Sequence, residues 1–288
     1  MTQYQRVGVH VSAAGGVENA PENARELGAE CFQFFSRSPR GGAAPTITKE
    51  QASLFRERCE EHNFESYIHT PYYINFASKK KLLAAAAPRI IREELERGSL
   101  LGVKYVVTHL GSAFEWDDSM NGQASLTAIQ QVVEGIKAIY AGNKTFTTRL
   151  LLEISAGSGA VIGDTFEELV AILEAVGRND VHICLDTCHM LASGYDIRTK
   201  ETLDATMSQF DKTIGLSQLK LAHINDSKTD LGSHKDRHEH IGDGKIGYEG
   251  FKHLLTHPAF RKVNFIIETP HDQKITNDID LLKKWRVA

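Results

Sequence analysis

Eight short runs of β-branched, aromatic and Leu residues recur along the chain, and longer stretches with helical periodicity separate them. Several runs are apolar almost throughout, which is typical of parallel strands buried on both faces. Eight strands that alternate with helices favour the α/β class and a closed (β/α)8 TIM barrel. The predicted strands are VGVHVS (7–12), CFQFF (31–35), SYIHT (66–70), YVVTHL (105–110), RLLLEIS (149–155), HICLDT (182–187), LKLAHIN (219–225) and NFIIET (264–269).

Helical patterns over 48–63, 124–140 and 165–177 lie between these runs. Thr165 stands three residues before Glu168, and Gly177 closes the last of these patterns, as expected of a capped helix. An open doubly wound sheet is the alternative fold, but it usually has a GxGxxG turn after the first strand, which VSAAGG (11–16) lacks. We therefore predict one barrel domain over residues 1–288.

The bulk composition is that of an ordinary globular protein. The net charge of −4 argues against a nucleic-acid binder that works through basic surface alone. Neither a membrane-spanning run nor a secretory signal is evident, so we expect a cytoplasmic protein with no membrane partner and no obligate protein partner. The four cysteines have no paired spacing and are expected to be buried free thiols: Cys31, Cys59, Cys184 and Cys188.

The predicted strands carry polar residues at their C-terminal ends, where TIM barrels place their active sites. Carboxylates gathered at one barrel mouth repel one another and resist burial, so they need cations. The histidines beside them favour a borderline metal such as zinc over an all-oxygen site. Seven of the eight predicted strands end near a potential ligand, and the second strand, which ends in Phe35-Ser36, is the exception. The seven residues are His10, His69, His109, Glu153, Asp186, His223 and Glu268.

Two further segments add potential ligands. In LDTCHMLASGYD (185–196), His189 follows Asp186 by three residues. In the long segment after the seventh strand, His234, Asp236, His238 and His240 share one alternating phase, and spacing alone does not choose among them. Without His10, and with two of these four, the strong candidates number nine. Since a catalytic zinc uses about three protein ligands, this set predicts two or three ions.

The two most specific segments of the chain are LDTCHMLASGYD (185–196) and HINDSKTDLGSHKDRHEHIGDGKIG (223–247). They resemble the motifs of the endonuclease IV family, the metal-dependent apurinic/apyrimidinic (AP) endonucleases of base excision repair. The resemblance extends over essentially the whole chain, from GVHVSAAGG (8–16) to FIIETP (265–270). It implies a TIM barrel with three zinc ions, some of which manganese or iron could replace.

The resemblance also implies which residues bind each ion, and it selects Asp236 and His238 from the long loop. His10 is implied to orient a ligand instead of binding metal itself. One zinc would be held by His69, His109 and Glu153. A second would share Glu153 as a bridge and add Asp186, His223 and Glu268. The third would be held by His189, Asp236 and His238.

The implied activity is hydrolysis of duplex DNA on the 5′ side of an abasic site, leaving a 3′-hydroxyl and a 5′-deoxyribose phosphate. Glu153, Glu268 and His109 are implied to be catalytic, with Glu153 bridging two ions and Glu268 orienting the attacking water. Tyr72 and Tyr73 follow the third strand and could stack on bases, although such a pair could also be ordinary rim aromatics. The candidate phosphate contacts, which could equally be plain surface charges, are Arg40, Lys228 and Arg237.

This chain departs from the family pattern at several places, including Leu110 for a usual Pro and Tyr73 for a usual aliphatic residue. In EISAGSG (153–159), Ile154 stands where the family usually has Asn, and SRSPRGGAA (36–44) has Gly41 and Gly42 where an aromatic residue is usual. None of these changes removes an implied metal ligand. Two other hypotheses remain open. A single-metal sugar isomerase or epimerase on a related barrel would need about four of these ligands, and a non-catalytic binder of DNA lesions would need no intact ligand set.

Overall fold

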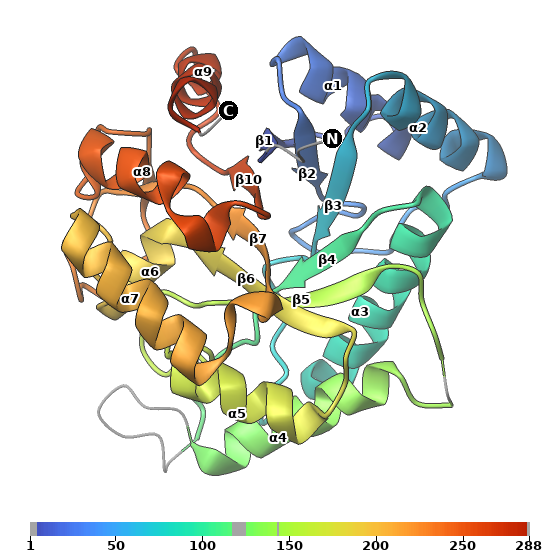
Figure 1. The fold of residues 1–288 in the computed structure, drawn as a ribbon. Helices are drawn as coiled ribbons and strands as arrows, with labels where there is room; N and C mark the ends of the chain where they lie inside the picture. The colour runs from blue at the N-terminus through green and yellow to red at the C-terminus, as the bar shows by residue number, and fades with distance from the viewer. Residues whose placement is uncertain (1–4, 117–124, 143, 287–288) are drawn as a thin grey trace.

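In the computed structural model, which describes residues 5–116, 125–142 and 144–286, eight parallel strands close into a barrel surrounded by helices (Figure 1). Around the barrel the strand order is β1-β10-β7-β6-β5-β4-β3-β2. The predicted (β/α)8 TIM barrel is therefore confirmed. The strands are β1 (Val7–Val11), β2 (Cys31–Phe34), β3 (Glu65–His69), β4 (Tyr105–Thr108), β5 (Arg149–Glu153), β6 (Val181–Asp186), β7 (Leu219–His223) and β10 (Asn264–Ile267).

Helices follow every barrel strand, and two of them, α6 and α7, follow β6. Thr48 caps α2 with a reciprocal pair of bonds to Gln51, and Thr165 caps α5 by accepting from the Glu168 amide at 3.1 Å. The predicted helix over 124–140 begins at Leu126, while its expected first residue lies outside the described residues. The helices are α1 (Ala20–Glu26), α2 (Lys49–Glu61), α3 (Lys81–Leu101), α4 (Leu126–Ile139), α5 (Phe166–Val176), α6 (Thr187–Ser193), α7 (Lys200–Thr213), α8 (Gly247–Thr256) and α9 (Ile275–Trp285).

Side chains alternate along each strand between the barrel interior and the layer beneath the helices. The interior is narrow: a Cβ on Gly8 would lie 2.0 Å from the Cys31 carbonyl oxygen, so only glycine fits there. The apolar interior layer consists of Cys31, Tyr67, Tyr105, Val107, Leu151, Cys184, Leu221 and Ile266. The inward position that follows this layer along each strand lies at the C-terminal mouth of the barrel, and the polar residues occupy it.

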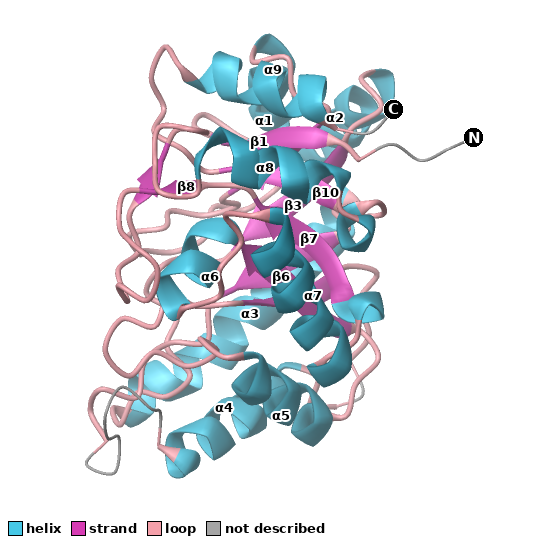
Figure 2. Ribbon diagram, turned by 60° about the vertical axis from the view of Figure 1, so that its left-hand side comes forward, coloured by secondary structure: helices cyan, strands magenta, loops and turns pink. Residues whose placement is uncertain are grey.

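The connection after β7 forms a small antiparallel ribbon of β8 (Asp226–Ser227) and β9 (His238–Glu239). Figure 2 shows β8 among the loops at the left-hand edge of the molecule. The Asp226 carboxylate is fully buried and accepts hydrogen bonds from five backbone amides of the same connection. A Cβ on Gly244 would lie 2.5 Å from Asp226 Oδ1, so glycine permits this close approach. The buried carboxylate thus organises the loop that carries Asp236 and His238.

The expected free thiols are confirmed for all four cysteines, of which Cys59 is half-buried and the others are buried. Within the described parts of the chain, no helix combines the length and the apolar character that crossing a bilayer requires.

Candidate metal centre

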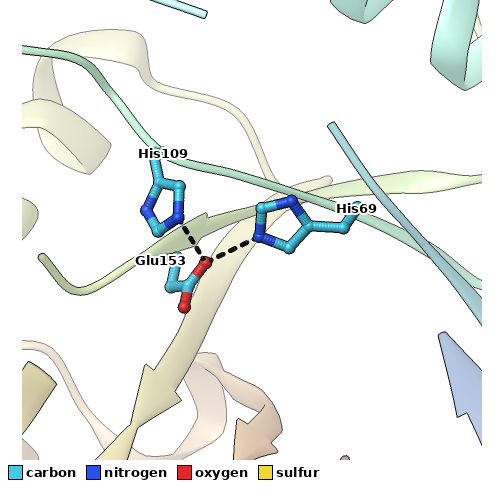
Figure 3. Close-up of side chains that lie close together, drawn as sticks. All are labelled: His69, His109 and Glu153. Carbon is cyan, nitrogen blue, oxygen red and sulfur yellow. Dashed lines mark hydrogen bonds and ion pairs between the residues drawn. The ribbon is translucent and has the colours of Figure 1, made fainter. Parts of the chain in front are cut away.

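His69, His109 and Glu153 meet at the barrel mouth from β3, the end of β4 and β5 (Figure 3). The Nε2 atoms of His69 and His109 lie 3.1 and 3.5 Å from the same carboxylate oxygen, Glu153 Oε2. One ligand atom from each residue lies within 4.8 Å of the others, so a single ion could contact all three. Glu153 and His69 are buried, whereas the His109 side chain is 30% exposed and borders the open side of this group.

A second group of candidate ligands surrounds the other carboxylate oxygen of Glu153, Oε1. His223 Nδ1 is 2.9 Å from Glu153 Oε1 and 3.3 Å from Glu268 Oε2. Asp186 completes the group, with Oδ2 3.9 Å from His223 Nδ1. Because each oxygen of Glu153 faces a different group, this one carboxylate could bridge two ions.

A third group joins the turn after β6 to the long loop after β7. Asp236 lies between two imidazoles, with its oxygens 3.3 Å from His189 Nε2 and 3.2 Å from His238 Nε2. Asp186 holds His189 in place, because its Oδ1 accepts from the His189 backbone amide at 2.8 Å and caps α6. Cys188 forms a further possible group with Asp186 and His238, but both of these belong to the groups already described. All nine predicted ligands thus converge on one mouth.

The orientations of three imidazoles suit metal binding. His69, His189 and His238 each place Nδ1 against a backbone carbonyl, that of Thr70 at 2.7 Å, Ile154 at 2.9 Å and Glu268 at 3.2 Å, respectively. A carbonyl only accepts, so the neutral ring carries its hydrogen on Nδ1 and turns the Nε2 lone pair toward the group. The Nε2 atoms of His189 and His238 are buried and have no hydrogen-bond partner among the described residues. Orphaned lone pairs beside carboxylates fit a metal site.

The buried carboxylates and imidazoles of this cluster shift one another's pKa. Burial on its own would raise the pKa of Glu153, but His109 and His223 outweigh it and hold that pKa well below its ordinary range. Burial would lower the pKa of His238, but Asp186 and Asp236 raise it to about 9. Carboxylates buried together in this way require positive charge beside them, and divalent ions would supply it.

The structure separates the four loop residues that share one sequence phase. Asp236 and His238 reach the mouth, whereas His240 turns away and forms a hydrogen bond with Asp278 Oδ2, 2.7 Å from its Nδ1. His234 has a positive φ of 53° and packs over Gly157, where a Cβ would lie 2.4 Å from His234 Nδ1. The ribbon and its bends, which spacing alone does not specify, decide which two residues face the site.

Two polar residues at the mouth escaped the sequence analysis, Gln33 and Asn225. The second strand ends in Phe35-Ser36, but its inward residue at the mouth is Gln33, whose amide nitrogen lies 2.6 Å from Glu268 Oε1. Asn225 donates to Asp186 Oδ2 at 2.6 Å and accepts from the Glu268 amide at 2.7 Å. Both side chains are fully buried. Because side chains two residues apart on a strand share a face, Gln33 points into the barrel as Cys31 does. The inward position of Gln33 could therefore be predicted from the sequence.

His10 lies beside the second group without joining a candidate metal group among the described residues. Its Nδ1 is 3.5 Å from Glu268 Oε1 and 3.1 Å from the Gln33 amide nitrogen. This arrangement is consistent with a residue that orients Glu268.

A cavity of about 500 Å³ opens beside the third group and the exposed edge of His109. Tyr72 and Tyr73 line it, with 68% and 41% of their surfaces exposed. The three predicted phosphate contacts, Arg40, Lys228 and Arg237, are also exposed and lie on loops that follow barrel strands. Ile154, by contrast, is buried and contributes only its backbone carbonyl to the site.

Known proteins resemble this chain over nearly its full length. A family profile described as "Xylose isomerase-like TIM barrel" matches residues 21–285. "Probable endonuclease 4" of Carboxydothermus hydrogenoformans is 39% identical over 281 residues, covering 97% of this chain and 96% of that protein. The protein of the same name from Chlorobium phaeobacteroides is 37% identical and covers 98% of each chain.

Solved structures also resemble this chain over nearly its full length. Endonuclease IV from Thermus thermophilus superposes with a TM-score of 0.85 at 32% identity, covering 97% of this chain and 98% of that one. A D-tagatose 3-epimerase-like protein superposes with a TM-score of 0.72, but at 18% identity this likeness extends to the fold alone.

Proposed function

Because this chain belongs to the endonuclease IV family and is a metal-dependent nuclease, we propose that it hydrolyses duplex DNA on the 5′ side of abasic sites. The products would be a 3′-hydroxyl and a 5′-deoxyribose phosphate. The observation that carries the proposal is the convergence of nine candidate ligands in three groups, two of which share Glu153. A phosphodiester resists attack because it is negatively charged, and clustered cations remove that obstacle.

We assign three zinc ions to the three groups. The first would be held by His69, His109 and Glu153, the second by Glu153, Asp186, His223 and Glu268, and the third by His189, Asp236 and His238. Bound divalent ions would lower the pKa of a water molecule and stabilise negative charge on the phosphate. The mixed imidazole and carboxylate donors fit zinc, while manganese or iron would also be accepted by such donors.

The protein residues have separate tasks in this proposal. Glu153 would fix the spacing between two groups through its two oxygens, and its complete burial keeps water from competing for them. Glu268, whose side chain is 19% exposed, would orient an attacking water. His109 lies where the ligand cluster borders the cavity, so it would be closest to the reacting phosphate.

The tyrosines provide a way to select the lesion. Tyr72 is anchored by edge contact with Phe35, at a ring-centroid distance of 5.2 Å, yet leaves most of its surface open. A rigid exposed ring of this kind can stack on bases that have lost a neighbour, and Tyr73 would extend the surface. Arg40, Lys228 and Arg237 would bind backbone phosphates, which position the duplex without reading its sequence.

A single-metal sugar epimerase on the same barrel is the alternative. Such an enzyme would need about four ligands, which the second group supplies. It would not explain why five further residues, His69, His109, His189, Asp236 and His238, converge beside it. Zinc content distinguishes the two functions, since about three ions per chain favour the nuclease and about one favours the epimerase.

The decisive test is nicking of a labelled duplex that contains one abasic analogue, compared with an intact duplex of the same sequence. We expect strand cleavage at the 5′ side of the lesion, loss of cleavage after metal chelation, and recovery on adding zinc or manganese. Product ends identify the chemistry, because hydrolysis leaves a 3′-hydroxyl that a polymerase extends directly. A metal-loaded protein that binds the lesion without nicking it would be a non-catalytic binder, and the proposed function would be wrong.

A further inference from the structure

Gln33 lies at the centre of the barrel mouth, on the inward face of β2. Its side chain is fully buried although it is polar, and it touches residues from three other strands. Its Nε2 lies 2.6 Å from Glu268 Oε1 and 3.1 Å from His10 Nδ1, while its Oε1 lies 2.9 Å from His223 Nε2. A buried polar group is costly unless it is hydrogen-bonded, and this amide finds its partners in two candidate ligands and in His10.

The chemistry of the partners fixes the orientation of the amide. A carboxylate only accepts hydrogen bonds, so the amide nitrogen of Gln33 must face Glu268. The amide oxygen then faces His223, and because that oxygen only accepts, His223 must carry a hydrogen on Nε2. In the neutral ring, the lone pair of His223 is therefore on Nδ1, the atom that faces Glu153 and Glu268.

The same amide also orients His10. Its second hydrogen points to His10 Nδ1, which accepts it, so the neutral His10 ring carries its own hydrogen on Nε2. One amide thus determines the hydrogen positions of two histidines and the rotamer of one carboxylate. The register supports this arrangement, since His10 and Gln33 are paired neighbours on β1 and β2.

We propose that Gln33 is a positioning residue for the second metal group, holding Glu268 and presenting Nδ1 of His223 as a ligand. This inference rests on the metal centre assigned above, but it does not depend on the DNA lesion that the enzyme cleaves. Gln33 is fully buried and lies outside the cavity that borders His109, so it acts through His223 and Glu268 and not on DNA.

The test compares Gln33→Met with a matched control in the same protein. Methionine has a similar volume and no hydrogen-bonding amide. Gln5 is another buried glutamine, 4% exposed, which precedes β1 at the end of that strand away from His10. Its Nε2 donates to the Phe260 carbonyl at 2.9 Å, and Phe260 is not a candidate ligand. Gln5→Met therefore reproduces the loss of a buried amide without disturbing a ligand.

The primary readout is zinc retained per chain during dialysis against increasing chelator concentrations, measured by elemental analysis. For Gln33→Met we expect about one zinc per chain to be lost at a roughly 10- to 100-fold lower chelator concentration than in the wild type, as is typical when the partner of a metal ligand is removed. The Gln5→Met protein should retain zinc as the wild type does. Steady-state nicking supplies a second readout: kcat should fall while KM stays within about twofold.

Gln33→Glu adds a check on the direction of each bond. Its carboxylate accepts from His223 as the amide does but does not donate to Glu268, so zinc retention should also fall. If Gln33→Met and Gln33→Glu both retain zinc like the wild type and keep its kcat, the inference is wrong. If Gln33→Met loses zinc but the wild type cleaves no abasic DNA, the proposed function fails and the assignment of Gln33 stands.

Discussion

Replacing Asp226 by Ala should weaken the fold and remove the third metal group together. Asp226 Oδ1 accepts from the amides of Ser227 at 2.7 Å and Ile246 at 2.8 Å. Its Oδ2 accepts from Gly242 and Gly244, both at 3.0 Å, and from Gly247 at 3.2 Å. The alanine variant leaves all five amides without this acceptor, inside the loop that carries Asp236 and His238.

The size of the effect follows from these bonds. A hydrogen bond to a charged acceptor contributes about 1.5–3 kcal/mol, but five bonds to one carboxylate are not additive, and a loosened loop lets water reach some amides. We therefore expect the free energy of unfolding to fall by about 3–5 kcal/mol, equivalent to roughly two such bonds lost outright. Zinc content should fall by about one ion per chain, since Asp236 and His238 lose their fixed positions.

Urea unfolding of the chelator-treated protein, followed by circular dichroism, measures the free energy of unfolding without a contribution from bound metal. Elemental analysis of the loaded protein measures zinc. Asp230→Ala is the matched control, because Asp230 lies in the same loop and its side chain, 79% exposed, forms a surface ion pair with Lys245 at 3.6 Å. A surface pair of this kind contributes about 0–1 kcal/mol. An Asp226→Ala protein with the stability and zinc content of Asp230→Ala would refute the role assigned to this carboxylate.

Three further predictions concern the proposed site and the thiols. Glu153→Ala and His109→Ala should each abolish nicking of an abasic duplex with the circular dichroism spectrum kept, and wild-type-like nicking by either variant would count against the assignment. Tyr72→Ala should reduce the preference for abasic over intact duplex while zinc content is unchanged, so equal discrimination by the variant would exclude base stacking by this ring. Burial raises the pKa of Cys59 to about 12, so at pH 8 very little thiolate is present and a thiol reagent should modify the folded protein far more slowly than the urea-unfolded one; rapid labelling of the folded protein would contradict this.

Much of the fold was predictable from local patterns. Buried parallel strands have apolar runs, and each strand of the barrel falls within or next to a run that the sequence marks, as β5 (Arg149–Glu153) does within 149–155. Helix ends follow local capping chemistry, as Thr165 and Gly177 show for α5. These features depend on neighbours in the sequence, so the sequence alone identifies them.

The candidate ligands were also predictable, because a barrel brings the ends of its strands to one face. The sequence therefore supplied the ligand types and their common location, and the family resemblance supplied their grouping. Gln33 was not predicted because its run ends in Phe35-Ser36, beyond the inward position at the mouth. Counting by two from Cys31 would have found it.

By itself, then, the sequence determined the barrel, the kind of ligand at its mouth and the family to which the chain belongs. Only the tertiary structure decided which atoms face one another. Spacing left four loop residues equivalent. In the folded protein the Asp226 carboxylate binds amides on both sides of this loop, and Asp236 and His238 reach the mouth while His240 pairs with Asp278. Such choices depend on hydrogen bonds between residues far apart in the chain, which periodicity does not encode.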